Sequence, residues 1–442
     1  MKTQLDKILI STRAPDFSEQ LQQLHRKLLY EARFGGFDEE SKANRQKVLD
    51  IIRDVDKRGY EAVREYTNKY DGVDIPPEEF RVSRRVLEKA HKEIDKDLLS
   101  LIRQAIQNVR KYQTEIYIGN FKHPGIKWTP IQRIGICVPG ASAPLPSTVI
   151  MTAVPAQVAG VREIVVVSPP RHNKDIHPVT LAVCCELGID EVYRVGGAQG
   201  VAALVTIIKV NKIVGPGNKW VQTAKLIEFG YVGIDSVAGP SEVLIIANEK
   251  ANPAWVAADM LSQAEHAPGS AVVFTDSQEL ARNILKELKK QLVLLSRAKQ
   301  TYKCLIEFGR IIRCKNMEEM IARTNEFAPE HLEIHCGKES KKIASKIENA
   351  GAIFIGDYSP VAVGDYWAGP SHTLPTGRTA RFFSALSAND FIKSTSIIEY
   401  SKEQLDKSAE DIIRLALAEG LDAHARSIKI RQQNPPGDGL RQ

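Results

Sequence analysis

The sequence of 442 residues lacks several features that would assign it to a particular class of protein. Its six cysteines form no Cys-x-x-Cys pair, which argues against a zinc ribbon or a thioredoxin-like redox motif. No apolar run approaches the roughly 20 residues of a membrane helix, and residues 1–7 lack the apolar core of a signal peptide. We therefore expect a cytoplasmic protein with no membrane partner.

The sequence also has little excess of charge of either sign. The 60 basic and 54 acidic residues leave a net charge of +6, which suits solubility or a mild attraction for anionic small molecules such as a dinucleotide. No nucleic-acid recognition motif occurs, so we expect no nucleic-acid partner. At about 150 residues per domain, the length predicts two large domains with smaller appended pieces.

The hydrophobic pattern changes along the chain. Residues 1–40 are polar and predict an arm or small subdomain, and helical periodicity from Ser41 to Val109 predicts a mainly α part. After Pro130, apolar β-rich runs alternate with helical segments, which is typical of parallel sheets with crossover helices. A boundary near Gly239 would separate two such sheets. The predicted strands are Ile134–Val138, Ile164–Val167, Val192–Val195, Ile213–Val214, Val243–Ile246, Val272–Phe274, Leu332–Ile334 and Ile353–Ile355. The tail predicts a short strand at Ser396–Tyr400 and helices over residues 402–419 and 422–434.

Two glycine-rich turns each join a predicted strand to a predicted helix, at Gly196–Gly200 and Gly215–Asn218. Glycines there let the backbone approach a phosphate, and a helix start offers free N–H donors. Two such turns in neighbouring units favour a nucleotide site at the carboxyl ends of the strands. Ordinary tight turns would explain the same residues.

Acid–base chemistry is available at Glu330 and His331, which precede a predicted strand. Adjacent strand residues point to opposite faces, so both reach one site only if the turn around Pro329 breaks the alternation. Ser241, before another strand, is a candidate hydrogen-bond donor to substrate. An exposed loop pair and a turn serine are the simpler alternatives.

Metal ligands are suggested by Gln263 and His266, which lie three residues apart and share a face on a helix. The pair needs partners from elsewhere in the chain. Asp365 and His372 lie in a segment rich in Gly and Pro, and His424 lies between two predicted C-terminal helices. A solvated surface position remains the alternative for each of these three.

Taken together, these segments resemble the histidinol dehydrogenase family. The matching blocks follow the family's order from about residue 130 to 430, with a weaker likeness over the N-terminal third. They read RIGICVPG, VGGAQG, GPGNKWVQTAK, AGPSEVLIIA, DMLSQAEH, APEHLEIH, GDYWAGPSHTLPT and AEGLDAHARS.

The resemblance implies a Zn²⁺-dependent, NAD-linked enzyme that oxidises L-histidinol to L-histidinaldehyde and then to L-histidine, consuming two NAD. It implies an acid/base pair of Glu330 and His331. The implied zinc ligands are Gln263, His266, Asp365 and His424. The implied substrate contacts are these four ligands with Ser241, His331, His372 and Glu419. The implied cofactor contacts are Gln199, Asn218 and the position of Cys137.

The resemblance also implies an α/β fold with two Rossmann-like parallel-sheet domains and small N- and C-terminal helical pieces. The family is an intertwined homodimer in which the C-terminal Glu and His enter the partner's site. The implied division is residues 1–31 as an N-terminal arm or small domain, 32–136 with 242–386 as a large metal and substrate domain, 137–241 as a cofactor domain, and 387–442 as a helical domain that reaches the partner.

The chain departs from the family pattern at four places, mostly on the cofactor side. Cys137 stands where the family usually has a Tyr that touches the cofactor. The second Gly of the usual VPGG is either replaced by Ala141 or displaced around Gly140, and residues 204–212 lack a usual Tyr-Gly-Thr stretch. Ser371 replaces a common Asn. The presumed metal set is intact.

Two other functions stay open. A paralogue of the same fold could oxidise another alcohol such as a sulfonated diol, although the carboxylate of Glu419 suits a cationic substrate and disfavours a sulfonate. A non-catalytic binding protein that keeps the fold is the other, and retention of the four presumed ligands and the acid/base pair argues against it.

Overall fold

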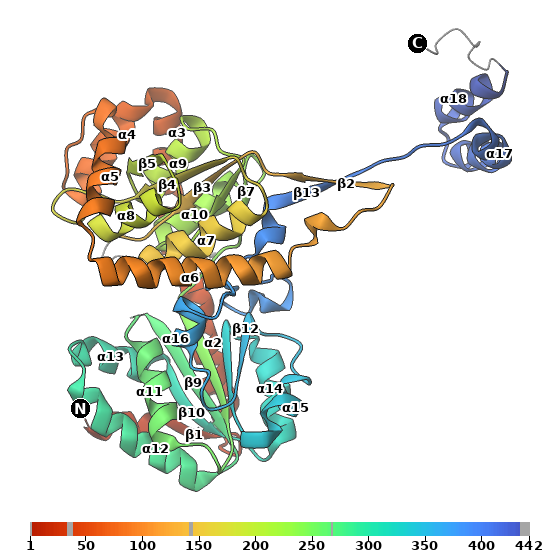
Figure 1. The fold of residues 1–442 in the computed structure, drawn as a ribbon. Helices are drawn as coiled ribbons and strands as arrows, with labels where there is room; N and C mark the ends of the chain where they lie inside the picture. The colour runs from red at the N-terminus through yellow and green to blue at the C-terminus, as the bar shows by residue number, and fades with distance from the viewer. Residues whose placement is uncertain (1, 33–38, 141–144, 267, 434–442) are drawn as a thin grey trace. The chain divides into compact units, whose positions relative to one another are not determined.

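The computed structural model describes residues 2–32, 39–140, 145–266 and 268–433. The chain forms two compact units, Met1–Gly119 with Pro130–Lys393 and Asn120–Thr129 with Ser394–Gln442. The first unit contains two parallel sheets covered by helices, so the α/β class expected from the sequence is confirmed (Figure 1). No helix among the described residues is long and apolar enough to span a bilayer.

One sheet has six parallel strands. Their spatial order is β1 (Leu9–Ser11), β10 (Gly309–Arg313), β9 (Gly269–Thr275), β8 (Ser241–Ala247), β11 (His331–His335) and β12 (Ala352–Ile355). The middle strands are buried on both faces, which is why they appear in the sequence as continuous apolar runs rather than alternating ones. Helices α11 (Pro253–Ala264), α12 (Gln278–Gln291) and α13 (Ala298–Phe308) lie on one side of the sheet, and α14 (Met317–Phe327) and α15 (Ser340–Ala344) on the other (Figure 1).

The N-terminal segment joins this six-stranded sheet. Strand β1 pairs in parallel with β10, and Leu5, Ile8, Phe17 and Leu24 are buried in the core of the same sheet. Helices α1 (Lys2–Leu5) and α2 (Phe17–Ala32) flank β1 in the sequence. The expected arm or small domain therefore contributes an edge strand to the fold.

The other sheet has five parallel strands. Their order is β5 (Glu191–Arg194), β4 (Glu163–Ser168), β3 (Arg133–Cys137), β6 (Lys212–Val214) and β7 (Gly233–Ile234). The strands run outward from β3 in both directions, so the order reverses between β3 and β6. Ligands of open α/β sheets bind in the crevice at such a reversal, beyond the carboxyl ends of the strands.

Helices cover both faces of the five-stranded sheet. Cys137 and Val167 pack on one face, and Ile134, Ile136 and Val166 pack on the other. The first face is covered by α3 (Glu39–Arg58), α4 (Tyr60–Asp71), α9 (Gly197–Thr206) and α10 (Lys219–Glu228). The second is covered by α5 (Arg84–Glu93), α6 (Lys96–Glu115), α7 (Pro146–Val158) and α8 (Pro178–Glu186). Helices α3 to α6 confirm the mainly α part that the periodicity predicts.

The second unit carries α17 (Lys402–Ala418) and α18 (Asp422–Gln433). Ser401 caps α17 through a capping box with Gln404, and Gly420 takes the left-handed conformation between the helices. Both helices match their predictions. The predicted strand at Ser396–Tyr400 is wrong, because β13 (Ile392–Ser396), which pairs with β2 (Ile126–Pro130), ends at Ser396.

Candidate active site

A cavity of about 1000 Å³ in the first unit is bordered by both sheets. The five-stranded sheet presents the carboxyl ends of its strands, through Cys137, Gly196 and Gly215. The six-stranded sheet presents the amino ends of β8 and β11, through Ser241 and His331. The cavity therefore lies between the carboxyl ends of the strands of one sheet and the amino ends of the strands of the other.

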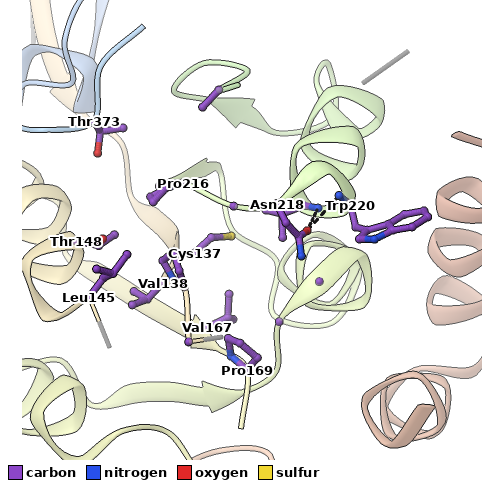
Figure 2. Close-up of a pocket in the computed structure, with 18 of the residues that line it drawn as sticks. Cys137, Val138, Leu145, Thr148, Val167, Pro169, Pro216, Asn218, Trp220 and Thr373 are labelled. Atoms are coloured by element: carbon purple, nitrogen blue, oxygen red, sulfur yellow. Dashed lines mark hydrogen bonds between the residues drawn. The ribbon is translucent and has the colours of Figure 1, made fainter. Parts of the chain in front are cut away.

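The two glycine-rich turns line this cavity as the sequence predicts. Gly197 and Gly215 have φ of 65° and 104°, which favour glycine. A Cβ on Gly215 would also overlap the carbonyl oxygen of Cys137, so the turn approaches β3 too closely for any side chain. Asn218 begins α10, and its side-chain oxygen accepts hydrogen bonds from the N–H groups of Trp220 and Val221 (Figure 2).

The turn at Gly215 is fixed by a buried ion pair. The Lys225 ammonium lies 2.5 Å from the Asp235 carboxylate and donates to the Gly215 carbonyl at 3.0 Å. The other oxygen of Asp235 accepts the Gly215 N–H at 2.7 Å. The N–H and the carbonyl of Gly215 are thus both hydrogen-bonded to the Lys225–Asp235 ion pair. This ion pair was not predicted from the sequence.

Glu330 and His331 both reach the cavity. Ala328 takes the left-handed conformation with φ of 49°, so the chain turns sharply before β11 and the simple alternation of a strand does not apply to Glu330. One oxygen of Glu330 accepts from the Ser241 hydroxyl and from the Glu242 N–H, each at 2.7 Å. The same oxygen lies 3.4 Å from His331 Nδ1. Ser241, Glu330 and His331 thus form one connected group.

The His331 ring is held with one nitrogen available. Nδ1 lies 2.9 Å from the Glu242 carbonyl oxygen, so Nδ1–H donates there. Nε2 has no hydrogen-bond partner among the described residues and lies 3.9 Å from the Asp365 carboxylate. An unpaired imidazole nitrogen beside a cavity is suited to accept and return a proton.

Burial and neighbouring charge act on these groups in opposite directions. Burial disfavours the charged imidazole, but the Glu330 carboxylate outweighs it and raises the pKa of His331 to about 9. Burial, reinforced by the charge of Glu330, raises the pKa of Glu242 to about 8. Burial lowers the pKa of His372. The site therefore holds titratable groups whose protonation states depend on one another.

The remaining predicted residues of the first unit gather beside this group. Asp365 lies on α16 (Val361–Tyr366), and its carboxylate is 3.9 Å from His372 Nδ1. His266, two residues after α11, lines the cavity with both of them. Gln263 lies in the last turn of α11 and is 2% exposed, and its Nε2 has no partner within the described chain. Gly269 permits this packing, because a Cβ there would collide with the Gln263 carbonyl oxygen.

Similarity to known proteins identifies the family of the chain. The sequence model of the histidinol dehydrogenase family matches residues 37–432. The chain belongs to the histidinol dehydrogenase family. Histidinol dehydrogenase from Oceanobacillus iheyensis is 45% identical over 401 residues, covering 88% of this chain and 93% of that protein. The protein of the same name from Caldanaerobacter subterraneus is 46% identical over 407 residues, covering 89% and 94%.

A solved histidinol dehydrogenase has the same fold. The crystal structure of the enzyme from Elizabethkingia anophelis aligns with a TM-score of 0.86 and 33% identity, covering 96% of this chain and 98% of that one. The resemblance found in the sequence blocks is thereby confirmed. The residue roles that the family implies remain predictions for this chain.

The structure brings most of the predicted site residues to one cavity. Its lining includes Cys137, Gln199, Asn218, Ser241, His266, Glu330, His331, Asp365 and His372. Gln263 lies in the last turn of α11, three residues before His266. Glu419 and His424 belong to the second unit, at the end of α17 and in the first turn of α18, and both are exposed.

Three departures from the histidinol dehydrogenase pattern fall in described residues. Cys137 is 5% exposed at the carboxyl end of β3, and burial raises the pKa of its thiol to about 12, so it stays uncharged. Residues 204–212 run from the last turn of α9 through a short link to the first residue of β6. The Ser371 hydroxyl is buried and donates to the Met151 carbonyl, which makes it a structural contact. Ala141 lies outside the described residues.

Sequence reasoning missed the supporting groups of the site. Glu242 is 2% exposed, supplies the carbonyl that orients His331 and accepts the Gly377 N–H. Its only signal in the sequence was a charged residue directly before a run of apolar strand residues. Glu333 and His335 carried a similar signal, since they alternate with the apolar residues Leu332 and Ile334 of β11.

Proposed function

We propose that the protein carries out the last step of histidine biosynthesis, the NAD-linked and zinc-dependent oxidation of L-histidinol to L-histidine through L-histidinaldehyde. The observation that carries the proposal is the unpaired Nε2 of His331. It faces a cavity shared with Asp365, while Nδ1 is fixed by a backbone carbonyl. Membership of the histidinol dehydrogenase family supports the same activity.

The residues present suit a zinc ion. His266 and Asp365 offer imidazole nitrogen and carboxylate oxygen, which are donors that zinc accepts, and Gln263 adds an amide oxygen, which is a poorer ligand. The Asp365 carboxylate has no close ion pair among the described residues, since the nearest imidazole nitrogens, of His331 and His372, stand 3.9 Å away, and it is therefore free to act as a ligand. When bound, zinc would hold the amine and imidazole of the substrate and so orient its alcohol carbon.

The cofactor would lie along the five-stranded sheet, a Rossmann-like arrangement. When bound, NAD would accept a hydride in each oxidation. Its phosphates suit the helix starts at Gly197 and Asn218, and Gln199 lines the same region. Cys137 would contact it through an uncharged thiol in place of the larger Tyr ring.

The protein's own residues move the protons. In the first oxidation the neutral form of His331, which predominates above its raised pKa of about 9, takes the hydroxyl proton of the substrate at Nε2. In the second, Glu330 acts as the base that adds water to the aldehyde, and His331 then removes a proton from the hydrated aldehyde. Ser241 donates to Glu330 and would exchange that bond for one to substrate.

We further propose a homodimer in which Glu419 and His424 of each chain complete the site of the partner, with Glu419 and His372 contacting the substrate. The domain boundaries implied by the family, and a cytoplasmic location, stay predictions. None of these alters the acid–base roles, which rest on residues of the first unit.

The test is NADH formation from L-histidinol by the zinc-loaded protein, with and without a chelator. We expect two NADH per histidinol, loss of turnover on metal removal and recovery with zinc. No turnover by the zinc-loaded dimer would refute the proposal, and oxidation of a sulfonated diol instead would point to the paralogous activity. Full turnover after complete metal removal would refute the zinc role alone.

A further inference from the structure

A second polar cluster lies along β11, beyond the cavity. Residues 331, 333 and 335 of this strand project to the same face, because strand residues alternate. Glu333 and His335 are joined there by Asp259 of α11, and ligand atoms of the three lie within 4.8 Å of one another. Asp357, shortly after β12, adds a fourth polar group.

The contacts in this cluster centre on Glu333. Its side chain is completely buried, and one oxygen accepts the Val361 N–H at 2.8 Å. The other oxygen lies 3.5 Å from His335 Nε2, which is itself 3.7 Å from the Asp259 carboxylate. His335 Nδ1 lies 3.4 Å from Asp357. The Val361 N–H and the His335 imidazole therefore offset the cost of burying the Glu333 carboxylate.

The cluster touches both elements that carry the metal ligands proposed for the first unit. Asp259 lies one turn before Gln263 on α11, and His266 follows the same helix. Val361 is the first residue of α16, which carries Asp365 one turn later. Strand β11, which carries Glu333 and His335, is held in the sheet because it pairs with β8 on one side and β12 on the other.

We propose that Glu333, together with Asp259 and His335, is a positioning residue that sets the separation of Gln263 and His266 from Asp365. This inference rests on the proposed zinc-dependent function. Metal ligands must be held within about 0.5 Å of their working geometry, and groups behind them supply that constraint. A single carboxylate bonded to one ligand-bearing helix, and clustered with a side chain of the other, is suited to that task.

The experiment compares Glu333→Gln and Asp259→Asn with the wild-type chain. Glu186→Gln is the matched control, because Glu186 also pairs with a histidine, His91, yet lies outside the cavity lining. Four quantities are measured: zinc affinity by chelator competition, zinc per chain, thermal stability, and amide hydrogen exchange over residues 361–366.

Glu333→Gln keeps an oxygen for the Val361 N–H but loses the charge that strengthens this hydrogen bond and the oxygen beside His335. We therefore expect it to weaken zinc binding by about 10- to 100-fold and to speed exchange over residues 361–366. Asp259→Asn, which acts only on α11, should weaken zinc binding without changing that exchange. Because Asp259 is partly exposed, this variant should fold even where Glu333→Gln does not. Glu186→Gln should lower stability alone.

Zinc affinity and exchange of Glu333→Gln indistinguishable from those of the control would overturn the inference. So would loss of one of two zinc ions per chain, since the cluster would then itself be a metal site. A wild-type chain without zinc or turnover would instead refute the proposed function. The exchange measurement needs no metal, so it would still report whether Glu333 holds α16.

Discussion

Replacement of His331 by Asn tests the role of Nε2 separately from that of Nδ1. The Asn amide nitrogen can take the place of Nδ1 and donate to the Glu242 carbonyl, which Nδ1 reaches at 2.9 Å. Nothing in Asn replaces Nε2, which faces the cavity without a partner among the described residues. The substitution therefore removes the proposed base while it retains the hydrogen bond that orients the side chain.

The expected loss follows from the role assigned to Nε2. General acid–base catalysis by a positioned side chain contributes roughly 10²- to 10⁴-fold, or about 3–5 kcal/mol of barrier. In the proposed mechanism His331 serves in both oxidations, so kcat for histidinol should fall by at least the lower of these factors. The stability cost should be about 1 kcal/mol, because the smaller side chain leaves a void beside Phe354, whose ring centroid is 5.9 Å away.

The assay follows NADH formation from L-histidinol at saturating NAD, with zinc content measured on the same sample. His91→Asn is the control, because that histidine pairs with Glu186 outside the cavity. Zinc content should be unchanged in both variants. A His331→Asn protein that turns over within about tenfold of wild type would remove His331 from the mechanism.

Three further predictions test neighbouring groups. Glu330→Gln keeps an oxygen for the Ser241 and Glu242 donors but cannot act as a base, so histidinaldehyde, measured with a carbonyl trap, should accumulate; equal slowing of both oxidations would contradict this. The Glu242 carboxyl, whose pKa rises from 4.5 to about 8 on folding, holds a proton that the unfolded chain releases, so stability falls as pH rises through that interval. Glu242→Gln lacks this ionisation, and its melting temperature should fall less on going from about pH 6 to pH 9; parallel pH profiles would refute the reasoning. Gly215→Ala forces a Cβ against the Cys137 carbonyl at positive φ, so KM for NAD should rise by tenfold or more, while an unchanged KM would place the cofactor elsewhere.

The fold was largely predictable because most of its strands are buried on both faces. Such strands appear as short apolar runs between turn residues, and each run predicted between Ile134 and Ile355 proved to be a strand. Strand β10 escaped prediction because Arg310 and Arg313 interrupt its apolar residues. Strand β1 has only three residues, and its place beside β10 depends on contacts some 300 positions away, which local sequence does not encode.

The site was predictable in composition but not in its supporting contacts. Chemistry and family blocks identified Glu330 and His331, yet the left-handed Ala328 that lets both face one cavity has no signature in the sequence. Likewise, the alternation of β11 places Glu333 on the face of His331 but does not reveal that α16 supplies its hydrogen-bond donor. Long-range partners of buried charges are set by tertiary packing.

Strand register explains why the proposed catalytic group comes from the amino ends of the strands of the six-stranded sheet. His331 pairs with Val243 and Val243 pairs with Ala271, so β8 begins two residues before β11 and places Ser241 level with the turn that carries Glu330. That offset lets one oxygen of Glu330 accept from both Ser241 and Glu242. Because side chains alternate with a period of two, a one-residue slip of β8 would turn Ser241 away from Glu330. The proposed acid–base chemistry therefore depends on the pairing of β8 with β11 as much as on the residues themselves.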